Sequence, residues 1–186
     1  MDDEQVFTGQ AILGRIPECR PATIVVRNGV VTHVEEESRA PDRWICPAFF
    51  NAHTHLGDTV AIDLPCSGSL IDLVTPPHGL KHRILARTPP CTLIRGMRSS
   101  VSDMISSGTA GFADFREGGV PGVRYLVDAV SDLSCRPVIL GRDGGEEIAQ
   151  GAGISSTRDV SSYPDIVDRM KKAGKIVAFH AGERDS

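Results

Sequence analysis

The sequence has few aromatic residues, no excess of positive charge and no long apolar run. Aromatic residues make up 5% of the 186 residues, which argues against the stacking platforms that bind single-stranded nucleic acid. The formal net charge of -4 provides no basic surface for nucleic acid. No stretch approaches the roughly 20 apolar residues of a membrane-spanning helix. We therefore expect neither nucleic acid nor a membrane among the partners.

The cysteines lack the spacing of a disulfide framework or a thiolate metal site. There are 5 of them, which is an odd number, they are scattered, and they form no C-x-x-C motif. The acidic residues 1–4 also lack the basic and apolar regions of a signal peptide. These features predict a protein of the reducing cytoplasm.

Residues 1–43 are predicted to form a small β module. Runs rich in β-branched residues at 22–27 and 30–34 flank the dipeptide Asn28-Gly29. Asn-Gly between such runs indicates a β-hairpin, because a type I′ turn needs positive φ angles at both central residues.

After residue 44 the pattern changes to alternating strands and helices, which predicts parallel β-α units. Strands are expected at 44–52, 109–115, 137–140, 153–156 and 176–179, and helices at 92–107, 121–133 and 164–173. A loop-rich insertion with five prolines separates the first strand from the first helix. An eight-stranded barrel needs about 250 residues. The count of about five strands therefore leaves an open sheet and an incomplete barrel as alternatives.

Three histidines follow predicted strands. His53 and His55 come directly after the apolar run 44–50, and alternation along a strand turns residues i and i+2 to one face. His180 follows the strand at 176–179. The carboxyl ends of parallel strands form the active-site face in α/β folds. Three convergent imidazoles with one open position make a catalytic type of zinc site, which lowers the pKa of bound water toward about 7.

Glu183 lies three residues after His180. A carboxylate there can act as a general base and then as a general acid, as hydrolytic deamination requires. One interpretation of Asp58 and Asp114 is that they contact the substrate or the metal ligands. The alternative is that they cap helices or form turns. The alternative interpretation of the three histidines is that they are unrelated residues of the core or the surface. The alternative interpretation of Glu183 is that it is simply exposed to solvent.

These motifs resemble the amidohydrolase superfamily. Residues 45–56, which contain Asn51-Ala52-His53-Thr54-His55, resemble the first barrel strand of that family, which follows strands of an N-terminal β-sandwich. Residues 177–183 resemble the His-x-x-Glu of its cytosine-deaminase-like and chlorohydrolase-like branch, where the histidine binds metal and the glutamate shuttles protons. The absence of lysine from 151–158 argues against the binuclear branch with a carboxylated lysine. A phosphoesterase of the PHP type is the rival, although its His-x-His usually opens the chain.

The resemblance implies an α/β fold of the (β/α)₈ TIM-barrel type. The barrel would occupy residues 44–186 and be truncated after about five strands. Residues 1–43 would form a small N-terminal β-sandwich module. It implies a mononuclear metal-dependent amidohydrolase that hydrolyses or deaminates a C–N bond of a cyclic or heteroaromatic small molecule through a metal-activated water. His53, His55 and His180 would hold the divalent metal, with zinc favoured and iron the alternative. Glu183 would be catalytic, and the insertion at 58–87 would contribute to the substrate site.

Members of that family continue through three more strands, which carry a further histidine and a metal-binding aspartate. Residues 1–186 thus resemble the N-terminal half of such an enzyme. Two functions remain open: an active hydrolase, and a non-catalytic truncated or split half that needs a partner chain. The expected partners are a small-molecule substrate and either a second copy of the chain or a complementary C-terminal half.

Overall fold

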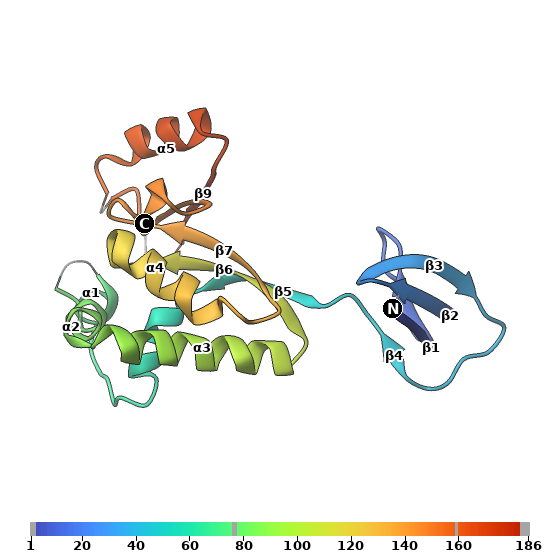
Figure 1. Cartoon of the computed structure of the whole chain (residues 1–186). Coiled ribbons are helices and arrows are strands. Elements are labelled where there is room, and N and C mark those ends of the chain that lie inside the picture. The colour runs from blue at the N-terminus through green and yellow to red at the C-terminus, as the bar shows by residue number, and fades with distance from the viewer. Residues whose placement is uncertain (1–2, 76–77, 159, 183–186) are drawn as a thin grey trace. The chain divides into compact units, whose positions relative to one another are not determined.

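The computed structural model describes residues 3–75, 78–158 and 160–182 and divides into two compact units (Figure 1). The first unit is Met1–Ala48 and the second is Phe49–Ser186. The boundary falls a few residues later than the division after residue 43 that the sequence predicts. In the described ranges, none of the helices combines the length and the apolar character needed to cross a membrane.

The first unit is a four-stranded sheet with the order β3-β2-β1-β4. Its strands are β1 (Glu4–Leu13), β2 (Glu18–Arg27), β3 (Val30–Glu36) and β4 (Trp44–Ile45). Asn28 and Gly29 join β2 to β3 with φ angles of 50° and 76°, so the predicted hairpin is confirmed. Ala11, Ala22 and Ile24 form the buried core of this sheet.

The strand predicted at 44–52 is two separate strands. Trp44–Ile45 pairs in parallel with β1, whereas β5 (Phe49–Thr54) belongs to the sheet of the second unit. Pro47 lies in the break, where its missing N–H cannot contribute to a ladder. Although the run is apolar, it is not buried, because β5 is an edge strand of the described sheet and Phe49 is 63% exposed.

The second unit contains a five-stranded sheet with the order β5-β6-β7-β8-β9, and each neighbouring pair is parallel. The strands after β5 are β6 (Thr109–Arg116), β7 (Arg136–Gly141), β8 (Gly151–Ile154) and β9 (Ile176–Phe179). The main crossover helices are α3 (Pro90–Ser106), α4 (Gly119–Val130) and α5 (Tyr163–Lys172). These elements confirm the predicted alternation of strands and helices.

The proline-rich insertion between β5 and α3 contains more helix than its sequence suggests. It includes the 3₁₀ helix η1 (Leu56–Ala61) and two short helices, α1 (Leu70–Val74) and α2 (Leu80–Arg87). Ser69 begins α1 with a capping box, because its hydroxyl accepts from the Asp72 N–H and the Asp72 carboxylate accepts from the Ser69 N–H. The prolines therefore separate short helices instead of excluding them.

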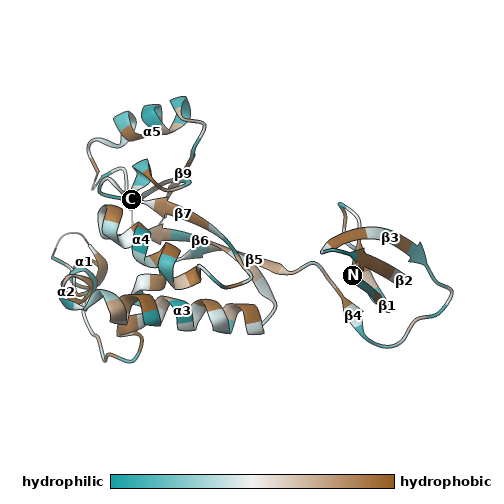
Figure 2. Ribbon diagram, viewed as in Figure 1, coloured by the Kyte–Doolittle hydropathy of each residue, from teal (hydrophilic) through white to brown (hydrophobic). Residues whose placement is uncertain are grey.

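The two faces of the parallel sheet carry separate apolar clusters. On one face α3 and α4 pack their apolar sides against Phe112 and Ile139, and Figure 2 shows apolar and polar bands alternating along α3. On the other face Ala113, Phe115 and Leu140 form a smaller apolar cluster. The alternation of Phe112 and Ala113 in β6 between the two clusters follows the period of a strand.

Truncation of Leu126 tests the contribution of the helix-covered face. Leu126 is fully buried in α4, so Leu126→Ala is expected to lower the free energy of unfolding by about 2–5 kcal/mol through lost burial and a residual cavity. Urea unfolding measures the change. The neighbouring Val127 is 49% exposed, and Val127→Ala should have a much smaller effect. Equal losses in both variants would contradict the packing described here.

Candidate metal centre

The structure brings together the three histidines that the sequence singles out. His53 lies near the end of β5, His55 follows it directly, and His180 follows β9. The Nε2 atom of His180 is 3.0 Å from the Nε2 atoms of both His53 and His55, and those two are 3.2 Å apart. The three ring nitrogens therefore converge on one small volume.

This convergence requires a curled sheet. His53 and His180 come from β5 and β9, which are the two outer strands of the described sheet. Neighbouring strands lie about 4.8 Å apart, so the outer two of five strands would be about 19 Å apart in a flat sheet. A 3.0 Å contact between side chains at their carboxyl ends is possible only because the sheet curls into part of a barrel.

The ring of Phe115 forms the floor beneath the three histidines. It projects from β6 and is 3% exposed, and its centroid lies 4.6 Å from that of His53 and 4.3 Å from that of His180. The His55 ring stacks on the same residue at 5.6 Å. Contact with one rigid aromatic ring restricts the rotamers of all three imidazoles.

The geometry of the nitrogens fits a metal ion. Nitrogen ligands about 2.0–2.1 Å from one tetrahedral zinc ion lie about 3.3–3.4 Å from each other, close to the separations seen here. Hydrogen bonds alone satisfy the cluster poorly. Each ring nitrogen either carries a hydrogen or offers a lone pair, so at least one of the three pairs must join two like groups. A cation that accepts three lone pairs removes this conflict.

Glu117, which the sequence analysis did not single out, adjoins this cluster. It is 6% exposed and follows β6 directly, at the same edge of the sheet as the histidines. Its Oε1 atom lies 3.1 Å from His55 Nδ1 and 2.7 Å from the Lys81 ammonium. The sequence carried a usable signal, since Glu117 is a charged residue at the carboxyl end of a buried strand.

Three basic side chains compensate the buried charge of Glu117. The Arg116 guanidinium lies 2.7 Å from Oε2, and the Arg142 guanidinium is 3.7 Å from Oε1. Burial raises the pKa of Glu117, but the hydrogen bond with His55 and the charges of Lys81, Arg116 and Arg142 outweigh it and bring the pKa well below its usual range. The carboxylate is therefore ionised at neutral pH.

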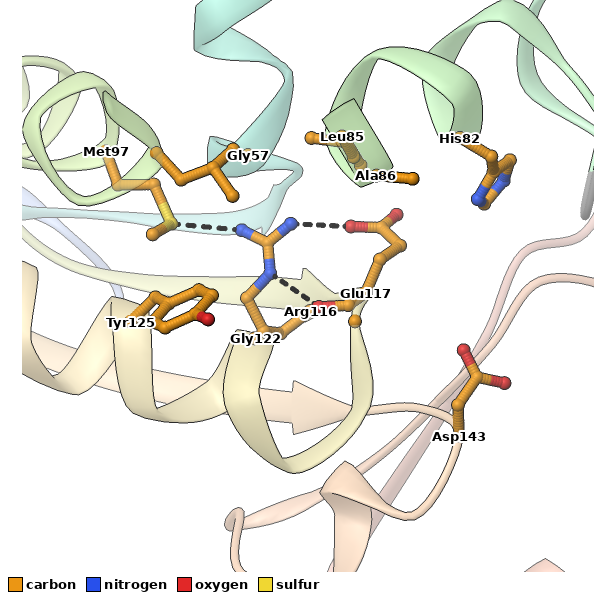
Figure 3. Close-up of a pocket in the computed structure, with 12 residues that line it drawn as sticks. Gly57, His82, Leu85, Ala86, Met97, Arg116, Glu117, Gly122, Tyr125 and Asp143 are labelled. Carbon is orange, nitrogen blue, oxygen red and sulfur yellow. Dashed lines mark hydrogen bonds and ion pairs between the residues drawn. The ribbon is translucent and has the colours of Figure 1, made fainter. Parts of the chain in front are cut away.

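Figure 3 shows how Arg116 is held beside Glu117. Its guanidinium lies between the Met97 sulfur, 3.2 Å from one nitrogen, and the Glu117 carboxylate. Gly57 passes directly over it, and a side-chain carbon at that position would overlap the guanidinium. These residues also line a pocket of about 290 Å³ between α2, α3 and α4.

Asp114 and Asp58 have different roles. Asp114 is fully buried, and its Oδ2 accepts from the Leu56 N–H at 2.6 Å and from the Thr54 hydroxyl at 3.0 Å. It thereby holds the Leu56 backbone and the Thr54 side chain on either side of His55, and burial raises the pKa of its carboxyl. Asp58 lies in η1 and pairs with Lys81 at 2.9 Å. The structure thus links both to the surroundings of His55.

An apolar pocket of about 430 Å³ adjoins His55, Asp58 and Lys81. Its other walls are mainly aliphatic side chains of the insertion, including Ile62, Leu73, Leu80, Ile84 and Leu85. An apolar recess with a few polar groups at one end is the usual form of a small-molecule site. Glu183, the predicted proton carrier, lies outside the described residues.

Comparison with known proteins identifies the family. Residues 44–186 match the Amidohydrolase family, and the chain belongs to it. A relative from Methanothermobacter thermautotrophicus, whose name assigns it provisionally to the aminohydrolases, is 36% identical over 199 residues. That match covers 91% of this chain and 52% of the relative. A relative from Archaeoglobus fulgidus with the same provisional name is 37% identical over 159 residues. That match covers 81% of this chain and 46% of the Archaeoglobus protein.

Solved structures show that the fold is that of TIM-barrel amidohydrolases. Atrazine chlorohydrolase of Arthrobacter aurescens TC1, complexed with zinc, superposes with a TM-score of 0.69 at 13% identity over 96% of this chain and 53% of its own. The 5-methylcytosine deaminase of Klebsiella pneumoniae, liganded with 5-fluorocytosine, gives a TM-score of 0.67 at 13% identity. This match covers 99% of the present chain and 52% of the deaminase chain. The chain therefore spans about half the length of the proteins it matches.

Removal of Asp114 tests how the segment around His55 is held. Asp114→Ala leaves the buried Leu56 N–H without its acceptor, so a loss of about 1–3 kcal/mol in the free energy of unfolding is expected. Asp132→Ala is the control, because Asp132 is 67% exposed in an ion pair with Arg98 and should contribute much less. Urea unfolding of both variants provides the comparison. An Asp114 variant as stable as the control would contradict the assigned role.

Proposed function

We propose that this chain forms the metal-binding half of an amidohydrolase that hydrolyses or deaminates a C–N bond in a cyclic or heteroaromatic small molecule. The convergence of three histidine Nε2 atoms within 3.0–3.2 Å of one another supports this proposal most strongly. His53, His55 and His180 would hold one divalent cation, and zinc suits a site of imidazole nitrogens. When bound, the cation would supply Lewis acidity that activates water for attack on the substrate.

The substrate class is proposed from the pocket and from the structural neighbours. The aliphatic walls of the 430 Å³ pocket would take the apolar faces of a ring, while Asp58 and Lys81 would meet its polar edge. Two structural neighbours are named for atrazine and 5-methylcytosine, and both compounds are nitrogen heterocycles. These likenesses support an amino-substituted heterocycle as substrate.

Glu183 is proposed as the residue that moves protons. It would take a proton from the attacking water and return it to the leaving nitrogen, as a general base and then a general acid. Glu183→Gln is expected to lower turnover by about 10²–10⁴-fold while leaving zinc affinity unchanged, because the residue is not proposed as a ligand. Ammonia release from a panel of aminotriazines and aminopyrimidines gives the turnover. Loss of zinc in this variant would contradict the separation of roles.

A second candidate function is that of a half-enzyme which acts only with a complementary chain. The chain spans about half of its relatives, and the outer strands β5 and β9 carry exposed apolar residues, among them Phe50 and Ile176 at 52% and 51% exposure. In the described part of the sheet each of these strands has one neighbour, and edges of this kind favour association. Assaying the chain alone and with the separately expressed second half of the Methanothermobacter relative distinguishes the candidates, since only a half-enzyme would gain activity on mixing.

Metal analysis tests the proposed ligands directly. The chain is expected to bind about one zinc ion, and His53→Ala and His180→Ala should each weaken binding by more than about 100-fold, since even the partners of ligands contribute 10–100-fold. Competition with a chromogenic chelator measures the affinity. His33→Ala is the matched control, because His33 is an exposed histidine of the first unit. Unchanged affinity in both of the first two variants would disprove the proposed site.

A further inference from the structure

The Nδ1 atoms of two of the clustered histidines face specific neighbours. His180 Nδ1 lies 3.2 Å from the Ile154 carbonyl oxygen, which can only accept a hydrogen bond. The Arg142 guanidinium also approaches this nitrogen, but its contact is longer, at 3.5 Å. The hydrogen of that ring therefore belongs on Nδ1, and Nε2 offers its lone pair toward the other two histidines. The backbone of β8 thus sets the tautomer of His180.

His55 Nδ1 faces two competing neighbours. The Glu117 carboxylate and the Lys81 ammonium each lie 3.1 Å from it. A carboxylate accepts and would hold a hydrogen on Nδ1, whereas an ammonium donates and would require that hydrogen on Nε2. In the second arrangement an N–H would point at the nitrogens of His53 and His180, and the ring could not bind a cation through Nε2.

The closer contacts of Lys81 resolve this competition. Its ammonium lies 2.7 Å from Glu117 Oε1 and 2.9 Å from Asp58 Oδ2, which are both shorter than its distance to His55. Two of its three hydrogens therefore have charged acceptors, which make the stronger bonds. Lys81 therefore has charged partners of its own and does not need His55, while Arg116 and Arg142 also hold the Glu117 carboxylate.

We propose that Glu117 is a positioning residue that keeps the hydrogen of His55 on Nδ1 and thereby turns the Nε2 lone pair toward His53 and His180. This inference rests on the proposed metal site. Glu117 suits the role because Arg116 fixes its second oxygen at 2.7 Å and its side chain is 95% buried. A carboxylate that accepts from the far nitrogen of a histidine ligand orients the ring and raises its basicity as a ligand.

Nitrogen NMR of the metal-free chain tests the tautomer without any change at Glu117. In a chain labelled with ¹⁵N-histidine and held at about pH 8, the His55 signals are expected to show a protonated Nδ1 and an unprotonated Nε2. His55→Gln identifies the signals by their loss. Lys81→Met should leave this pattern unchanged. A protonated Nε2 in the unaltered chain, or a change of tautomer in Lys81→Met, would overturn the proposal.

Metal affinity tests the consequence. Glu117→Ala is expected to weaken zinc binding by about 100-fold and Glu117→Gln by about 10-fold, because the amide oxygen of glutamine can still accept from Nδ1. Glu146→Gln is the matched control, because Glu146 is also buried and paired with an arginine, Arg169. The zinc affinity of this variant should be unchanged. Circular dichroism establishes whether each variant is folded. If a Glu117 variant does not fold, the NMR result on the unaltered chain decides the proposal by itself.

The outcomes separate this inference from the function on which it rests. If the unaltered chain binds no zinc, the proposed metal site fails and the inference fails with it. If it binds zinc through the three histidines and folded Glu117 variants bind equally well, only the role of Glu117 is wrong. Equal weakening by Glu146→Gln would likewise overturn it, because the effect would then follow from the loss of any buried carboxylate.

Discussion

The curl of the parallel sheet is the constraint on which the candidate site depends. His53 and His180 lie on its two outer strands, and only curvature brings their Nε2 atoms within 3.0 Å. The right-handed twist of parallel strands, covered by α3 and α4 on one face, produces this curvature. Phe115 then fills the concave face beneath the imidazoles, so packing and site geometry rest on the same strand, β6.

Balanced burial of charge is the second feature of the site. Three charged residues lie close together at the end of β6, and each is at most 6% exposed: Asp114, Arg116 and Glu117. An isolated buried charge would be very costly, and these residues persist because each has charged or hydrogen-bonding partners. Asp114 holds the backbone beside His55, and Glu117 contacts its ring. The end of one strand thus supports a histidine that another strand supplies.

Much of this arrangement could be predicted from the sequence because it depends on local patterns. Asn28-Gly29 indicated the hairpin, and alternating apolar runs indicated the parallel strands that carry the histidines. The division of the 44–52 run at Pro47 was missed, since an apolar stretch does not reveal which of two sheets will pair with each part. Glu117 was also missed, because its importance arises from Lys81, which is 36 positions earlier in the chain. Its position at the end of a buried strand was a local signal, whereas its contacts with Lys81 and His55 follow from tertiary packing.

X-ray absorption at the zinc edge is the sharpest test of the proposed metal centre, because it identifies the atoms around the ion. For the zinc-loaded chain, we expect a single site with three imidazole nitrogens about 2.0–2.1 Å from zinc. Each of His53→Gln, His55→Gln and His180→Gln should lose one of these imidazole ligands. Fewer than three imidazoles in the unaltered chain, or a sulfur ligand about 2.3 Å from zinc, would contradict it.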